Sequence, residues 1–106
     1  MIPLPTATTS SQLAALISRS DDYKLSKSAL HCLCVIDAAG ADSLTMTTTA
    51  RTMRTSTAAL TGIADQLEEL GFITHRPARL DRRVIWLELT ERGKDALKDI
   101  LTTASH

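Results

Sequence analysis

The fold is decided by residues 56–93, which read STAALTGIADQLEELGFITHRPARLDRRVIWLELTERG. In the first part of this stretch the apolar residues recur at the one- and three-residue intervals of a helix, and they are Leu60, Ile63, Ala64, Leu67 and Leu70. This spacing predicts a helix over Ser56–Leu70 that ends at Gly71. From Phe72 the period changes to two, which predicts strands over Phe72–Arg76 and Val84–Leu89 with a basic loop between them.

Helix and strand signals outside this stretch predict further elements. A first helix begins near Ser10 or Ser11, either of which can cap its free amides. Thr90 can cap the last helix in the same way. The expected elements are, in chain order, this first helix, a helix over Ser26–Ala39 that stops at Gly40, a strand over Ser43–Met46, a helix over Thr47–Arg54, and, after the hairpin, a helix with an apolar stripe from Ala96 to Ala104.

The resulting order is helix, helix, strand, helix, helix, strand, strand, helix. A mainly α fold with a small β-hairpin in this order is a winged helix-turn-helix, in which the hairpin (the wing) covers the open side of a helical core. With 106 residues, the chain fits one domain. We assign residues 10–106 to it and expect Met1–Thr9, with its two prolines, to form a flexible arm.

The turn between the third and fourth helices is the first informative site. Ala50 is small enough to let the two helices cross closely, and Met53 and Thr55 are expected to point toward the core. Ser56 can cap the fourth helix. Arg54 stands where the turn usually has a glycine.

Composition narrows the possible functions. The chain has twelve basic and twelve acidic residues, but residues 72–94 hold six basic and three acidic ones. No apolar run approaches the ~20 residues of a membrane-spanning helix, so we expect a cytoplasmic protein without a membrane partner. Cys32 and Cys34 lie two positions apart on a helix, and with His31 they do not supply the four ligands of a structural zinc site. We expect no metal, no cofactor and no enzymatic activity, because no catalytic constellation is present.

Residues 60–77 resemble the recognition helix and first wing strand of the MarR family, and residues 81–93 resemble its wing, second strand and following helix. The spacing from Asp81 to Thr90 matches without a gap, and the resemblance covers about residues 25–100. It implies a homodimeric bacterial transcription regulator that binds double-stranded DNA at a near-palindromic operator. Many members also respond to a small-molecule effector, but one Trp, one Tyr and one Phe offer little aromatic lining for such a ligand.

The start of the fourth helix is expected to enter the major groove of DNA. Its candidate contacts are all small residues, namely Ser56, Thr57, Ala58, Thr61 and Gly62, and Gly62 falls where the family often has arginine. Arg51, Arg54 and Gln66 are candidate phosphate contacts nearby. Since hydroxyl groups can bond to several bases, we expect modest sequence readout or partial reliance on DNA shape.

The wing arginines are expected to have two roles. Arg76, Arg79 and Arg82 are candidate contacts to the minor groove and its flanking phosphates. Arg83 is in phase with Ile85 and Leu87, so we expect it to face the domain. There it would pair with Asp81, or with Asp65 of the recognition helix, and fix the wing against that helix.

The terminal helices leave a second function open. The stripe over Ala96–Ala104, with Leu13 and Ile17, is a plausible dimer interface. However, the terminal helices are short, the net charge is zero and the recognition helix lacks long polar side chains. A winged helix that serves as a protein-interaction module in a replication, defence or phage or plasmid assembly complex is therefore the alternative.

Overall fold

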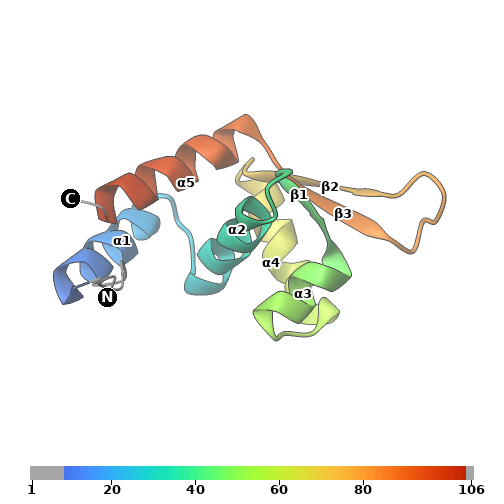
Figure 1. Ribbon diagram of the computed structural model, residues 1–106, viewed down its shortest axis with the longest axis horizontal. Coiled ribbons are helices and arrows are strands. Elements are labelled where there is room, and N and C mark those ends of the chain that lie inside the picture. The colour runs from blue at the N-terminus through green and yellow to red at the C-terminus, as the bar shows by residue number, and fades with distance from the viewer. Residues whose placement is uncertain (1–8, 105–106) are drawn as a thin grey trace, which may run out of the picture.

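The computed structural model describes residues 9–104, which contain five helices and three strands (Figure 1). The elements are α1 (Ser10–Asp22), α2 (Lys27–Ala38), β1 (Ser43–Thr45), α3 (Met46–Met53), α4 (Thr57–Glu69), β2 (Ile73–Pro77), β3 (Ile85–Leu89) and α5 (Glu91–Ala104). Their order is the predicted one, and the winged helix fold is confirmed. The expected flexible arm lies outside the described residues except for Thr9. No helix among the described residues is long and apolar enough to cross a membrane.

The start of α1 differs from the prediction. Its cap is Thr9, neither Ser10 nor Ser11: the Thr9 Oγ1 accepts a hydrogen bond from the Gln12 amide at 3.2 Å. In return, the Gln12 side chain accepts one from the Thr9 amide at 2.7 Å. This reciprocal capping box requires a Glu or Gln three residues after the cap, and only Thr9 has one.

The sheet has three antiparallel strands in the order β1-β3-β2. The hairpin runs in register from Ile73 opposite Leu89 to Pro77 opposite Ile85. The short strand β1 adds to the other edge of β3, where Leu44 lies opposite Leu87. The distal half of the hairpin extends away from the helical body, so its loop is presented to solvent on both sides (Figure 1).

The core is built around α2. Its side chains Ala29, Cys32, Leu33 and Ile36 are buried, together with Leu60 and Leu67 of α4, Leu87 of β3 and Ile100 of α5. Helix α2 is thus central, and Cys32 is a core residue. Burial raises the pKa of the Cys32 thiol to about 12, so it stays protonated and unreactive.

The junction between α4, the hairpin and α5 depends on two glycines. Gly71 adopts φ +82° after α4, and the Phe72 amide donates to Leu67 O at 2.9 Å. Thr90 then joins the two ends of the hairpin: its hydroxyl donates to Gly71 O at 2.6 Å and accepts from the Gly93 amide at 3.0 Å, which confirms Thr90 as the cap of α5. A Cβ atom on Gly93 would lie 2.9 Å from the carbonyl carbon of Phe72 and closer still to its oxygen. The backbone of α5 therefore directly touches the backbone of Phe72, the residue just before β2.

A polar cluster holds α1 against α5. Asp99 Oδ2 accepts hydrogen bonds from Arg19 Nε at 3.0 Å and Nη2 at 2.6 Å, and from the Tyr23 hydroxyl. The Tyr23 and Arg19 donors hold the pKa of Asp99 below its usual range. Since the folded-state pKa is lowered, the cluster stabilises the fold above the ordinary Asp pKa. That contribution is lost as the pH falls through the lowered value.

We predict that Gly93→Ala destabilises the protein by about 2–3 kcal/mol, because the new methyl group must displace the Phe72 backbone rather than a flexible side chain. Gly62→Ala is the matched control: Gly62 lies within a helix with no atom within 4 Å of an added Cβ. Alanine at this position should stabilise by up to about 1 kcal/mol. Urea unfolding of both variants measures the two effects, and equal free energies of unfolding would contradict the role given to Gly93.

Candidate nucleic-acid interface

The turn between α3 and α4 has the geometry of a Schellman motif. The Thr55 amide donates to Ala50 O at 3.0 Å and the Arg54 amide to Arg51 O at 3.1 Å. Arg54 itself adopts φ +57° and ψ +45°, the left-handed conformation that a glycine would take at no steric cost. Ala50 is buried, Met53 packs against the core and Thr55 is half-buried, as predicted.

Helix α4 divides into a buried and an exposed face. Leu60, Ala64 and Leu67 are buried in the core. The exposed side includes the predicted contact residues Ser56, Thr57, Ala58, Thr61, Gly62 and Gln66, together with Asp65. Ser56 caps the helix, as predicted, by accepting a hydrogen bond from the Ala59 amide at 3.0 Å. The leading part of α4 therefore presents its small side chains to solvent.

Four arginines around this helix have no acidic partner among the described residues. Arg51 and Arg54 lie on α3 and in the turn that leads into α4, while Arg79 and Arg82 lie in the loop of the hairpin. All four are exposed, and within residues 9–104 none of them makes an ion pair or a side-chain hydrogen bond. Their charges are therefore available to a ligand.

The other two wing arginines have partners on the hairpin. Arg76 Nη2 lies 3.4 Å from Glu88 Oε2 on the neighbouring strand. Arg83 donates from Nε and Nη2 to the two carboxylate oxygens of Asp81 at 3.1 and 3.2 Å. The Arg83 guanidinium holds the pKa of Asp81 below its usual range. The predicted pairing of Arg83 with Asp81 is thus confirmed.

The predicted orientation of Arg83 is wrong. Its side chain is 90% exposed, and within the described residues its hydrogen bonds go to Asp81, not to Asp65 of α4. The reason is local: the Val84 amide donates to Asp81 O at 3.0 Å, so residues 81–84 form a turn and strand alternation starts only at Ile85. The Asp81–Arg83 pair therefore shapes the loop and does not fix the wing against α4.

A different pair connects α4 to the wing. Glu68 Oε2 accepts a hydrogen bond from the His75 amide at 3.1 Å and lies 3.0 Å from His75 Nδ1. Sequence reasoning missed this contact because it spans the end of a helix and the start of a strand, where no single period applies.

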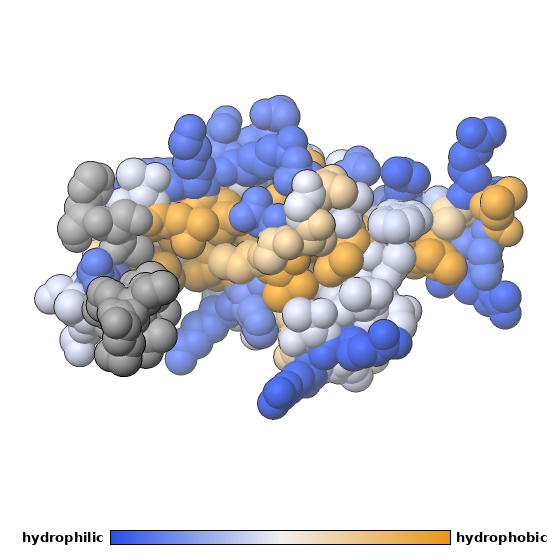
Figure 2. Space-filling view, in the orientation of Figure 1, coloured by the Kyte–Doolittle hydropathy of each residue, from blue (hydrophilic) through white to orange (hydrophobic). Residues whose placement is uncertain are grey.

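At the hairpin tip, Leu80 is fully exposed, and Figure 2 shows an apolar patch among strongly hydrophilic groups there.

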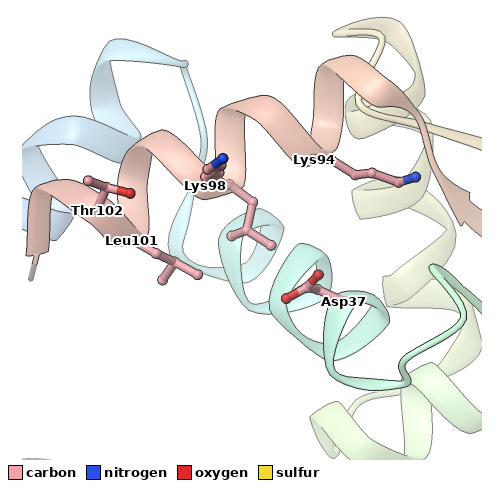
Figure 3. A pocket seen from close by; sticks show the side chains of 6 residues that line it. Asp37, Lys94, Lys98, Leu101 and Thr102 are labelled. Carbon is pink, nitrogen blue, oxygen red and sulfur yellow. The ribbon is translucent and has the colours of Figure 1, made fainter.

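Two hollows lie away from this surface. One, of about 300 Å³, lies between α2 and α5 and is bordered by Asp37, Lys94 and Lys98 (Figure 3). Lys94 is already held by Asp42 at 3.0 Å and Glu91 at 3.3 Å. The other, of about 420 Å³, lies between α1 and α2 and is mainly apolar. Cys34 lines it, and burial together with nearby Asp37 raises the pKa of that thiol.

A three-helix core, a tight turn into an exposed helix and a basic hairpin define a winged helix-turn-helix protein. A sequence profile of the MarR family matches residues 25–85, and the chain belongs to this family. It is also similar to the transcriptional repressor MprA of Escherichia coli K12, with 46% identity over 41 residues, or 39% of this chain and 23% of the repressor.

Solved structures share the fold over most of the chain. YusO from Bacillus subtilis has a TM-score of 0.79 and 25% identity, covering 90% of this chain and 66% of its own. AbsC from Streptomyces coelicolor, a MarR family transcriptional regulator, has a TM-score of 0.77 and 17% identity over 89% and 64% of the two chains. A mutant MarR from E. coli complexed with operator DNA has a TM-score of 0.74 and 19% identity over 88% and 65%. The chain thus spans less than two thirds of MprA and just under two thirds of these structures.

We predict that Arg54→Gly raises the free energy of unfolding by about 1 kcal/mol, because glycine removes the steric cost of the left-handed conformation at the turn. Arg54→Ala is the control, since it removes the guanidinium and keeps the Cβ atom that causes the cost. Chemical denaturation should rank Gly above Ala at this position. The reverse order would mean that the Arg54 backbone is not strained.

Proposed function

We propose that this protein is a DNA-binding transcription regulator that inserts the start of α4 into the major groove and places the β2–β3 loop at the minor groove. The observation that carries the proposal is the set of four exposed arginines without acidic partners, on α3, in the turn and in the wing. The functions of relatives support it, since MprA is a transcriptional repressor and a MarR structure contains operator DNA.

In this proposal the first turn of α4 binds the DNA backbone. A helix N-terminus offers unpaired amides and a positive potential to phosphate, and Ser56 and Thr57 lie there. Arg51, Arg54 and Gln66 bind flanking phosphates. Because Ala58 and Gly62 are small, the helix backbone can approach the base edges closely.

The wing binds through Arg79 and Arg82, whose guanidinium groups are available for phosphates and the minor groove. Arg76 contributes less, because Glu88 already neutralises part of its charge. The Asp81–Arg83 pair keeps the loop in shape. With Arg51 and Arg54, four arginines thus bind DNA, while Arg76 and Arg83 mainly support the hairpin.

We also propose that the protein acts as a homodimer of one domain, residues 10–106, paired through its terminal helices. The expectation that the whole α5 stripe lies at the interface is wrong, because Ala96, Leu97 and Ile100 are buried in the core. On α1, Leu13 is 50% and Ile17 is 39% exposed, beside the apolar hollow that α1 forms with α2. Apolar side chains grouped in this way are typical of an interface. Two copies related by a two-fold axis would match the two half-sites of a near-palindrome.

The DNA contacts predict a specific salt dependence. Affinity for a duplex found by random-sequence selection should fall with salt at a log–log slope of about −0.9 for each phosphate contacted. Arg79→Ala and Arg82→Ala should each make this slope shallower and weaken selected and random DNA alike. Arg76→Ala and Arg83→Ala are the controls and should change the slope less. Fluorescence anisotropy measures all four.

Two results would contradict these contacts. Unchanged affinity in Arg82→Ala would remove the wing from the interface. A selection that enriches no sequence, with a stable protein partner recovered instead, would replace DNA binding by the protein-interaction function.

The dimer predicts a change of mass. The double variant Leu13→Glu/Ile17→Glu should give the mass of a monomer in light scattering, because it places carboxylates in the proposed apolar interface. Leu80→Glu is the matched control: it changes an equally apolar, exposed side chain on the hairpin loop and should leave the dimer intact. A double variant that keeps the wild-type mass would place the interface elsewhere.

A further inference from the structure

We propose that α4 recognises thymine methyl groups and that Thr61 is the residue that determines this specificity. The inference rests on the proposed function and identifies which chemical group the recognition helix detects. In the major groove, thymine presents a C5-methyl group beside its O4 acceptor, and an apolar contact to that methyl distinguishes it from cytosine.

The hydrogen bond of Thr61 limits what this residue can recognise. Its Oγ1 donates to Thr57 O at 2.8 Å. A hydroxyl has one proton, so Thr61 cannot also donate to the O6 or N7 acceptors of guanine or to O4 of thymine. What remains is its γ-methyl group and the lone pairs on Oγ1, which accept from amino groups only. Thr61 is therefore suited to a methyl contact, with adenine or cytosine amino groups as secondary partners.

The neighbours of Thr61 on the exposed face add no donor. Ala58 lies three residues before Thr61 and four before Gly62, so both residues lie one turn from Ala58 on the same side of the helix. Nothing lies within 4 Å of the position of a Cβ on Gly62, which leaves room for a base edge. The side chains that can donate lie at the margins, at Ser56 and Thr57 on one end and Gln66 on the other. The centre of the face therefore has no free side-chain donor, and the donors and the Asp65 carboxylate lie around it.

The test replaces single thymines by deoxyuridine in a duplex obtained by random-sequence selection with the dimer. This exchange removes the C5-methyl group and leaves base pairing intact. At one or two positions in each half-site, the affinity of the wild-type protein should fall about fourfold, the factor expected when one buried methyl contact is lost. At the other thymines the affinity should stay the same.

Two variants assign the effect to Thr61. Thr61→Ser keeps the hydroxyl and removes the γ-methyl, so it should bind the thymine and deoxyuridine duplexes equally and about as weakly as the wild type binds deoxyuridine. Thr61→Val keeps a methyl at that position and loses the hydroxyl, so it should preserve the fourfold difference. Circular dichroism confirms that each variant is folded.

The outcomes distinguish a failure of the methyl contact from a failure of DNA binding. Equal wild-type affinity for thymine and deoxyuridine at every position overturns the methyl contact and leaves DNA binding standing. A fourfold difference that persists in Thr61→Ser assigns the contact to another residue and overturns the role of Thr61. If the wild-type protein binds no duplex from the selection, the proposed function itself fails, and the methyl contact fails with it.

Discussion

The backbone contact between Gly93 and Phe72 is the constraint on which the rest of the structure depends. At this point Phe72, in the short connection between α4 and β2, meets the first turn of α5 so closely that no side chain fits between the two backbones. The hydroxyl of Thr90 adds hydrogen bonds to both sides of the junction. Because α4 and the wing leave the same junction, their relative orientation is set by main-chain geometry. A side chain on Gly93 would push α5 away from the segment that joins α4 to the hairpin.

The basic residues of the protein fall into two groups, those paired with carboxylates and those without such a partner among the described residues. The chain carries no net charge, yet its basic groups are not equivalent. Arg19, Arg76, Arg83 and Lys94 are held by carboxylates and stabilise the contacts between elements or the shape of the hairpin. Within the part of the chain that the structure describes, Arg51, Arg54, Arg79 and Arg82 have no such partner. A neutral total is therefore compatible with a local field that attracts an anion, since screening limits surface charges to distances of about 10 Å.

The sequence predicts the fold well because apolar residues recur with one period in helices and with another in strands. The change from helical spacing to alternation at Phe72 locates the hairpin, and Gly71 marks the end of α4. Predictions become weaker where no period applies. Strand alternation predicts that Arg83 faces the domain, but Arg83 lies in a turn. The hydrogen bond that the His75 amide donates to Glu68 joins a strand to a helix. The hydrogen bond of Thr61 depends on a side-chain rotamer, which spacing along the chain does not reveal. The sequence thus predicts which face of α4 is exposed, whereas the structure shows which hydrogen bonds the side chains of that face can still donate.

The open space beside Gly62 has a consequence for how such a protein can diverge. The position lies in the middle of an exposed helix face and has no neighbour that a new side chain would displace. Nearly any residue fits there without a penalty in folding, and most favour the helix more than glycine does. A single codon change could therefore replace a face proposed to contact methyl groups with one that carries a long hydrogen-bonding side chain. Recognition and stability are uncoupled at this site, so duplicated copies of the gene could acquire separate targets one substitution at a time.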